Sequence, residues 1–252
     1  MRILLTNDDG ILAEGLIALY EELKGDFELS VVAPEIEMNA VGHAITLSNP
    51  LRVRRINRNG VFFGYGVSGT PADCVKIAVH EILQERPDIV LSGVNLGSNV
   101  GINLLYSGTV SAAMEGAFLG FPSIAISLNT KEDPDFSFAA RFSRRIIEFV
   151  MENGLSVGTA LNVNIPCIPE DQIKGISFTT QDLIRQRDEY EKRRDPRGNV
   201  YYWLAEETPV EESISNTDLR ALTENRITIT PITFDLTDLK EMERLNSIGL
   251  DL

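Results

Sequence analysis

The spacing of hydrophobic residues in the first half of the chain predicts strands and helices that alternate. The apolar run at 3–5 predicts a buried strand, and helical spacing over 11–23 predicts a helix that ends near Gly25. A second apolar run at 27–33 stops at Pro34. A strand, a helix and a strand within about thirty residues form a βαβ unit, whose two strands run parallel.

The alternation continues to residue 166 with one interruption. Residues 44–65 alternate roughly between polar and apolar positions around Asn59-Gly60, which predicts an antiparallel hairpin. Thr70 is a good N-cap for a helix that runs to about residue 83. The whole pattern predicts a doubly wound, mostly parallel α/β sheet with helices on both faces. Its remaining elements are strands at 89–92, 123–127 and 161–165, and a helix that begins at Asp133-Pro134 and ends at Gly154.

The pattern weakens beyond Pro166. Residues 182–194 mix charges of both signs, which favours a solvated helix face or a flexible arm over a binding patch. Strand-like stretches flank them and suggest a projecting hairpin, and the aromatic residues on it, Trp203 among them, favour a subunit contact. We therefore divide the chain into a core, 1–166, and a C-terminal extension, 167–252. The extension has strands at 176–180, 200–204 and 226–232, a short helix after Thr217-Asp218, and a helix at 237–245.

The charge and the cysteines narrow the class of protein. A net charge of −14 over 252 residues argues against binding to a nucleic-acid polymer, because such binding depends on Lys and Arg side chains that neutralise phosphates. A small phosphorylated substrate remains compatible, since a local metal ion inverts the field at a site. Cys74 and Cys167 form neither a disulfide framework nor a zinc pattern. With no signal-peptide pattern and no membrane-spanning apolar stretch, we expect a soluble, cytoplasmic protein.

Two adjacent carboxylates, Asp8 and Asp9, directly follow the first strand. In open α/β sheets the carboxyl ends of the strands form the edge where ligands bind. Adjacent acids repel each other unless a cation or a shared proton relieves them, and Mg²⁺ prefers oxygen ligands. These residues alone leave two interpretations open, a metal site and an ordinary turn with solvated acids.

Two further loops reach the same edge of the predicted sheet. The loop after the second strand carries Asn39 and His43, and a glycine-rich loop after a later buried strand carries Asn95 and Asn99. An amide side chain supplies a neutral carbonyl ligand or a hydrogen-bond donor. His43 suits either protonation of a leaving alkoxide or a structural role in pinning its loop. His80 lies in an apolar helix and is typical of a packing or surface residue.

The helix that begins at Ser107-Gly108-Thr109 is the candidate phosphate site. Free backbone N–H groups and two hydroxyls at a helix N-terminus form a cradle for phosphate oxygens, although an ordinary Ser/Thr cap explains the same residues. The sequence lacks the Walker pattern, and no GxGxxG opens the first helix. Neither a P-loop NTPase nor a dinucleotide-binding enzyme is therefore favoured.

Several stretches of the chain, taken in the order in which they occur, resemble the SurE family. These are the stationary-phase survival proteins, which are metal-dependent nucleotidases. The resemblance implies a Rossmann-like sheet whose C-terminal extension exchanges elements between subunits of a homodimer or homotetramer. It also implies 5'-nucleotidase activity on nucleoside 5'- and 3'-monophosphates, and some members of the family shorten polyphosphate. The resemblance extends over essentially the whole chain. The matching stretches are 3–10, 42–46, 68–73, 94–103, 106–116, 162–166 and 228–231.

The resemblance also implies a set of metal ligands. One divalent cation per subunit, Mg²⁺ or Mn²⁺, would be held by Asp8, Asp9 and Asn95. The fourth ligand would be Asn39, at a position that is usually serine in the family. Asp8 or Asp9 would alternatively orient the attacking water as a base, and the sequence does not separate these roles.

The mechanism that we expect divides the work between metal and helix. The cation polarises the phosphoryl group and activates a water molecule. The non-bridging oxygens are held by Ser107, Gly108 and Thr109, and Asn99 adds a donor. Two alternatives remain open: a sensor that binds nucleotides without turnover, and a sugar-nucleotide or dinucleotide enzyme on the same fold.

Overall fold

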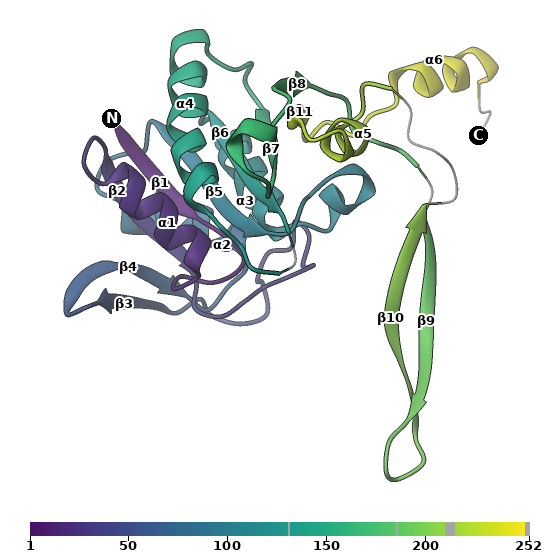
Figure 1. Cartoon of the computed structure of the whole chain (residues 1–252), viewed down its shortest axis with the longest axis horizontal. Coiled ribbons are helices and arrows are strands. Elements are labelled where there is room, and N and C mark those ends of the chain that lie inside the picture. The colour runs from purple at the N-terminus through teal and green to yellow at the C-terminus, as the bar shows by residue number, and fades with distance from the viewer. Residues whose placement is uncertain (131, 185, 210–214, 250–252) are drawn as a thin grey trace.

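A nine-stranded mixed sheet forms the centre of the molecule (Figure 1). The computed structural model describes residues 1–130, 132–184, 186–209 and 215–249. The strand order is β3-β4-β2-β1-β5-β6-β7-β11-β8. The strands are β1 (Arg2–Thr6), β2 (Glu28–Pro34), β3 (Val53–Arg58), β4 (Val61–Val67), β5 (Ile89–Leu96), β6 (Ser123–Asn129), β7 (Thr159–Pro166), β8 (Ile176–Phe178) and β11 (Ile227–Thr233).

Helices cover both faces of this sheet, which confirms the doubly wound α/β prediction. Side chains of β1 alternate between the two layers: Ile3 and Leu5 pack against α1 and α4, whereas Leu4 packs on the opposite side against α2. The α-helices are α1 (Glu14–Leu23), α2 (Pro71–Ile77), α3 (Gly108–Phe118), α4 (Ser137–Asn153), α5 (Asp218–Thr223) and α6 (Leu239–Ile248). Shorter helical turns are η1 (Ala78–Ile82), η2 (Gly101–Leu105) and η3 (Glu170–Gln172).

The strand order reverses between β1 and β5. From β1 the chain moves outward through β2 to β4, and from β5 it moves outward on the other side through β6 to β7. β1 pairs in parallel with both β2 and β5, so these strands end at one edge. Ligands of open α/β sheets bind at such a reversal, outside the carboxyl ends of the strands. The loops after β1, β2 and β5 are therefore where the fold predicts a ligand site.

Some of the predicted element boundaries are confirmed by the structure and others are wrong. Asn59 and Gly60 have φ values of 51° and 79°, as a type I′ hairpin turn requires, and the hairpin β3-β4 is confirmed. The helix predicted from Thr70 to residue 83 instead ends at Ile77 and continues as the wider turn η1. The helix predicted from Asp133-Pro134 instead begins at Ser137, as α4, because Asp133 has a φ of 44°, which lies outside the helical region.

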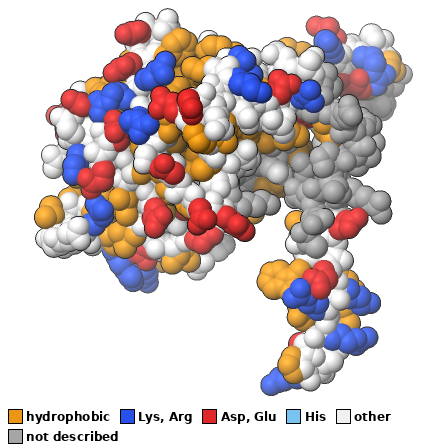
Figure 2. Space-filling model, in the orientation of Figure 1, with side chains coloured by type: hydrophobic (Ala, Val, Ile, Leu, Met, Phe, Trp, Pro, Cys, Tyr) orange, Lys and Arg blue, Asp and Glu red, His pale blue; other side chains and the backbone are white. Residues whose placement is uncertain are grey.

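The charged stretch at 182–194 is not a helix face, and the projecting hairpin predicted for this region is confirmed. Its residues 186–194 form β9 (Gln186–Arg194), which pairs antiparallel with β10 (Val200–Pro209) in a hairpin, here called the arm. The arm projects from the body of the molecule, and Lys, Arg and hydrophobic side chains gather on it (Figures 1 and 2). Contacts between side chains on the two strands, rather than burial, stabilise the arm. The Lys192 ammonium, for example, lies 5.9 Å from the centre of the Tyr202 ring.

The C-terminal extension contributes to the central sheet as well as to the arm. β11 pairs antiparallel with β7 along six residues and in parallel with β8. α6 is exposed along its length, including its apolar residues Leu239, Met242, Leu245 and Ile248. Both cysteines are free. None of the helices in the described ranges is both long enough and apolar enough to cross a membrane.

Candidate active site

A cleft of about 520 Å³ opens at the carboxyl ends of β1 and β5. It brings together many of the residues predicted from the sequence, although they lie far apart along the chain. Asp9, His43, Gly108 and Thr109 are not part of its lining. The lining residues are Asp8, Asn39, Ala40, Asn95, Leu96, Gly97, Ser98, Asn99, Asn103, Tyr106, Ser107, Tyr190 and Leu204.

The turn after β1 is held by its own side chains and by the next loop. The buried Asn7 side chain donates to the Gly10 carbonyl at 2.9 Å, which closes the turn around the two acids. The Met38 N–H donates to the Asp8 carbonyl at 2.8 Å and fastens the loop after β2 beside it. Asn39 is therefore brought to the acids by a backbone contact, as the predicted metal site requires.

Asp8 lies against the N-terminus of α3. The Thr109 hydroxyl donates to Asp8 Oδ1, and the backbone N–H groups of Gly108 and Thr109 also interact with this carboxylate. Burial raises the pKa of Asp8, and these hydrogen bonds act against that rise. The expected metal and phosphate regions are thus in direct contact: the helix terminus that would hold a phosphate already stabilises a buried carboxylate.

This contact demands glycine at position 108. A Cβ there would lie 2.7 Å from Asp8 Cβ and 2.8 Å from Asp8 Oδ2, closer than side-chain atoms approach one another. The carboxylate fills the space that a larger residue would need. Gly108 therefore permits a close approach, in addition to its part in the helix terminus.

Asp9 is held in an environment that disfavours its charge. Burial, the neighbouring charge of Asp8 and, to a smaller extent, that of Glu37 raise the pKa of Asp9 to about 6, against the effect of a hydrogen bond from the Leu96 N–H. Glu37 was not recognised from the sequence. The buried carboxylate of Asp9, beside the charge of Asp8, is therefore the kind of group whose repulsion a divalent cation relieves.

The two asparagines complement these acids. Asn95 donates its side-chain N–H to the carbonyls of Gly97 at 2.8 Å and Leu96 at 3.3 Å, and Asn39 donates to Glu37. Each amide nitrogen is thereby engaged, and the amide oxygen is the atom suited to a hard cation. Within the described ranges no three residues among His, Cys, Asp and Glu cluster as a metal site. The predicted set consists instead of two carboxylates, Asp8 and Asp9, and two amides, Asn39 and Asn95.

Ser107 caps α3 and also lines the cleft. Its Oγ accepts the Val110 N–H at 3.1 Å, which leaves the hydroxyl hydrogen to donate elsewhere. Its carbonyl accepts from the Ser111 hydroxyl at 2.6 Å and from the Ser111 N–H. Thr109, in contrast, is fully buried and its hydroxyl is used by Asp8. Any contact of Thr109 with a phosphate would therefore come from its backbone.

Asn99 is fixed by residues of β6 and β7. Its side-chain N–H donates to Ser127 Oγ at 2.8 Å. The Asn164 side chain accepts from the Asn99 N–H at 2.7 Å and donates to its carbonyl at 3.1 Å, and Asn162 donates to the same carbonyl at 2.7 Å. The loop after β5 is therefore held rigidly beside the metal ligands proposed from the sequence.

His43 lies in a different set of contacts. Its Nε2 is 2.8 Å from Glu115 Oε2 on α3, and Lys76 Nζ is 3.1 Å from the other oxygen of Glu115. Burial acts to raise the pKa of Glu115, but the hydrogen bonds from His43 and Lys76 outweigh it, and the net shift is downward. His80 is exposed in η1, as the packing-or-surface interpretation allows.

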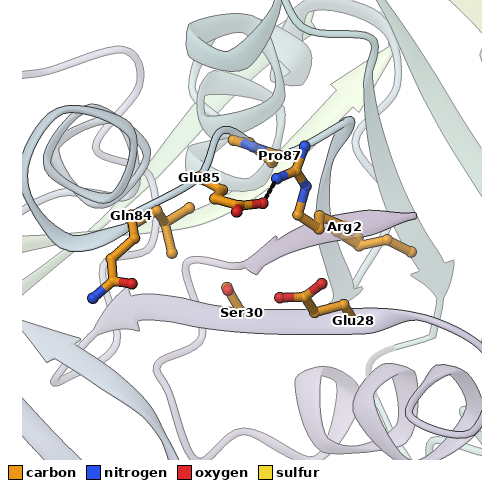
Figure 3. A pocket seen from close by; sticks show the side chains of 8 residues that line it. Arg2, Glu28, Ser30, Gln84, Glu85 and Pro87 are labelled. Atoms are coloured by element: carbon orange, nitrogen blue, oxygen red, sulfur yellow. Dashed lines mark hydrogen bonds and ion pairs between the residues drawn. The ribbon is translucent and has the colours of Figure 1, made fainter.

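A second cavity, of about 300 Å³, lies at the opposite, amino end of β1 and β2 (Figure 3). Its cation, Arg2, is ion-paired with Glu85. The Arg2 backbone N–H donates to Asp88 Oδ2 at 2.7 Å. Because its charge is already compensated and the cavity lies away from the carboxyl edge, we assign the candidate site to the cleft instead.

Comparison with known proteins identifies the family. Residues 3–188 match the family model described as Survival protein SurE. The chain belongs to the SurE family. It is 51% identical to the 5'-nucleotidase SurE of Syntrophus aciditrophicus (strain SB) over 249 residues, which cover 98% of this chain and 94% of that protein. It is 46% identical to the 5'-nucleotidase SurE of Moorella thermoacetica, over 97% of this chain and 95% of that protein.

A solved SurE structure has the same fold. The crystal structure of the SurE protein from Aquifex aeolicus superposes with a TM-score of 0.85 at 40% sequence identity, and the match covers 98% of this chain and 99% of that one. The Rossmann-like architecture implied by the sequence resemblance is therefore confirmed.

Of the cleft residues in this SurE chain that were not predicted, two come from the arm. Tyr190 and Leu204 are cross-strand partners in the arm, and both line the cleft. They follow the proposed metal ligands by almost a hundred residues or more, and nothing in their local pattern points to the acids. Predicting these two residues would have required the topology of the chain, which brings the arm back past the loop after β5.

Proposed function

We propose that this protein is a metal-dependent phosphomonoesterase that hydrolyses nucleoside 5'- and 3'-monophosphates to nucleoside and phosphate. The observation that carries the proposal is the contact of Asp8 with the N-terminus of α3, which joins a candidate metal ligand to a candidate phosphate cradle. The names of the relatives, 5'-nucleotidase SurE, support the same activity.

The residues of the cleft fit a divalent cation. Asp8, Asp9, Asn39 and Asn95 would hold it, because they offer two carboxylates with raised pKa values and two amide oxygens. When bound, Mg²⁺ or Mn²⁺ would supply Lewis-acid polarisation of a phosphoryl oxygen and a lowered pKa for a water molecule. One such ion per subunit is part of the proposal.

The protein's own groups would bind and orient the phosphate. The Ser107 hydroxyl has its hydrogen free, and it lies in the cleft beside Asp8. Together with the N–H groups of Gly108 and Thr109 it would donate to non-bridging oxygens, where negative charge builds up during hydrolysis. Asn99 would donate in addition. Asp8 or Asp9 would orient the attacking water, and we keep both as candidates for this role.

A second group of lining residues, here called the nucleoside end of the cleft, suits a nucleoside. It consists of Tyr106, Tyr190 and Leu204, and Asn103 adds a polar group. Aromatic rings stack on any nucleobase, and an amide provides hydrogen bonds to its edge or to the ribose. A single cleft lined by both Asp8 and aromatic residues favours a nucleotide over a simple phosphate ester.

The metal dependence and the substrate class are tested together. Purified protein with Mn²⁺ should release phosphate from nucleoside monophosphates, and EDTA should abolish the release until excess Mn²⁺ restores it. Tight nucleotide binding without phosphate release would favour the sensor. Turnover only with a nicotinamide or sugar-nucleotide substrate would favour the third alternative. Release that persists in EDTA would contradict the proposed mechanism.

The contacts of His43 support the structural one of its two candidate roles. We expect His43→Asn to keep kcat/KM within about threefold of wild type, whereas loss of a general acid typically costs a hundredfold or more. The lost hydrogen bond to Glu115 should lower the free energy of unfolding by about 1 kcal/mol, because the ring is partly exposed. Steady-state kinetics and urea unfolding measure both. His80→Asn, at the exposed histidine, is the matched control.

The assembly remains a proposal as well. Exposed Tyr202 and Trp203 on the arm and the exposed apolar residues of α6 suit contacts in the homodimer or homotetramer that the resemblance implies. The mass measured by light scattering would distinguish these assemblies from a monomer. Activity on short polyphosphate and a cytoplasmic location are further parts of the proposal.

A further inference from the structure

Gly101, at the start of η2, has both of its backbone groups bonded to side chains from the C-terminal extension. Its N–H donates to Asp218 Oδ2 at 3.0 Å, and its carbonyl accepts from Gln181 Nε2 at 2.9 Å. Gly101 has a φ of +59°, which other residues rarely adopt. The turn η2 thus starts from a residue whose position is set by two distant side chains.

Asp218 connects this turn to the base of the arm. The side chain is completely buried, and its second oxygen, Oδ1, accepts the N–H of Asp182 at 2.9 Å and that of Leu219 at 2.8 Å. Asp182 lies four residues before the arm begins at Gln186. The Asp218 carboxylate therefore accepts three backbone N–H groups. Through them it fixes η2 and the segment that leads into the arm relative to α5.

The elements fixed by Asp218 carry the residues at the nucleoside end of the cleft. η2 contains Asn103 and is followed by Tyr106, while the arm carries Tyr190 and Leu204. The phosphate end is held differently. Ser107 is bonded within α3, through Val110 and Ser111, and Asp8 is bonded to the start of the same helix.

We propose that Asp218 is a positioning residue for nucleoside recognition: it sets the turn that carries Asn103 and Tyr106 against the arm that carries Tyr190 and Leu204. The inference rests on the proposed function, since it assigns this end of the cleft to the nucleoside. Gln181 assists it at the Gly101 carbonyl. Asp218 acts through backbone groups, and we do not place it in contact with substrate.

The test compares two substrates that share the phosphate. In Asp218→Asn an amide N–H replaces one carboxylate oxygen and opposes a backbone donor. We expect KM for a nucleoside monophosphate to rise about tenfold, the effect of losing one hydrogen bond to a buried carboxylate, with kcat changed less than threefold. kcat/KM for p-nitrophenyl phosphate, which has no nucleoside, should stay within about twofold of wild type. Glu224→Gln, an exposed acid at the end of α5 paired with Arg220, is the matched control.

A second variant keeps the inference testable if Asp218→Asn does not fold. Gln181→Leu removes only the bond to the Gly101 carbonyl, and it should raise the nucleotide KM in the same direction by about threefold. Equal losses on both substrates, or an unchanged nucleotide KM in the folded variants, would overturn the positioning role. Failure of the wild type to hydrolyse any nucleoside monophosphate would refute the proposed function instead, so the two failures are distinct.

Discussion

Gly108→Ala should lower kcat/KM for nucleoside monophosphates by about a hundredfold or more, the scale of losing a donor that stabilises transition-state charge. The new methyl group would lie 2.7 Å from Asp8 Cβ, so either Asp8 or the start of α3 must move. Either displacement separates the candidate metal ligand from the N–H groups beside it. Alanine is the better helix former, so helix propensity does not oppose the change.

The measurement for this variant is steady-state phosphate release at saturating Mn²⁺, with circular dichroism to follow the fold. Gly25→Ala is the matched control, because Gly25 follows α1 and a Cβ there meets no atom within 4 Å. The control should keep wild-type activity. Activity of Gly108→Ala within threefold of wild type would show that the contact with Asp8 has no part in turnover.

Asp9→Asn should reduce Mn²⁺-dependent turnover by at least about a hundredfold, since even residues outside the ligand shell often cost ten- to a hundredfold when they are replaced. The fold should be kept, because the amide occupies the same space. Asp171→Asn, at an exposed acid in η3, makes the same chemical change away from the cleft and should be silent. Full activity of Asp9→Asn would refute the proposed ligand set.

The stability of the metal-free protein gives an independent reading of Asp9. Its pKa of about 6 in the folded state exceeds the ordinary value of 3.8, so its contribution to stability is complete at low pH and is lost as the pH rises through 6. Removing the charge should therefore help most above that pH. In EDTA, the Tm of Asp9→Asn minus that of wild type should be larger at pH 7.5 than at pH 5. A difference that does not grow with pH would contradict the buried, repelled carboxylate.

The convergence of the site could be predicted because it depends on one rule of parallel sheets. Asp8 follows β1 and Asn95 is the next-to-last residue of β5, and strands that run parallel have their carboxyl ends at one edge of the sheet. The helix start at Ser107 was visible from its own cap. None of these steps requires knowledge of which side chains touch, so local patterns were sufficient.

The features that were not predicted depend on contacts between distant parts of the chain. Residues 189–194 are all exposed, because β9 in the arm pairs with a single strand, and a pattern that reports burial cannot find such a strand. The burial of Asp218 is equally invisible, since two of its donors, Gly101 and Asp182, lie 117 and 36 residues away. The contact of Asp8 with Thr109 joins positions 101 residues apart.

The pairing of β11 with β7 bears on how the chain can be shortened. β7 carries the apolar residues Leu161, Val163 and Ile165, all buried, and its outer backbone groups are bonded by β11. A fragment that stops at residue 166 would keep both acids and the start of α3, but it would expose a long apolar edge strand, which is a template for aggregation. The last third of this protein therefore protects the solubility of the first two thirds.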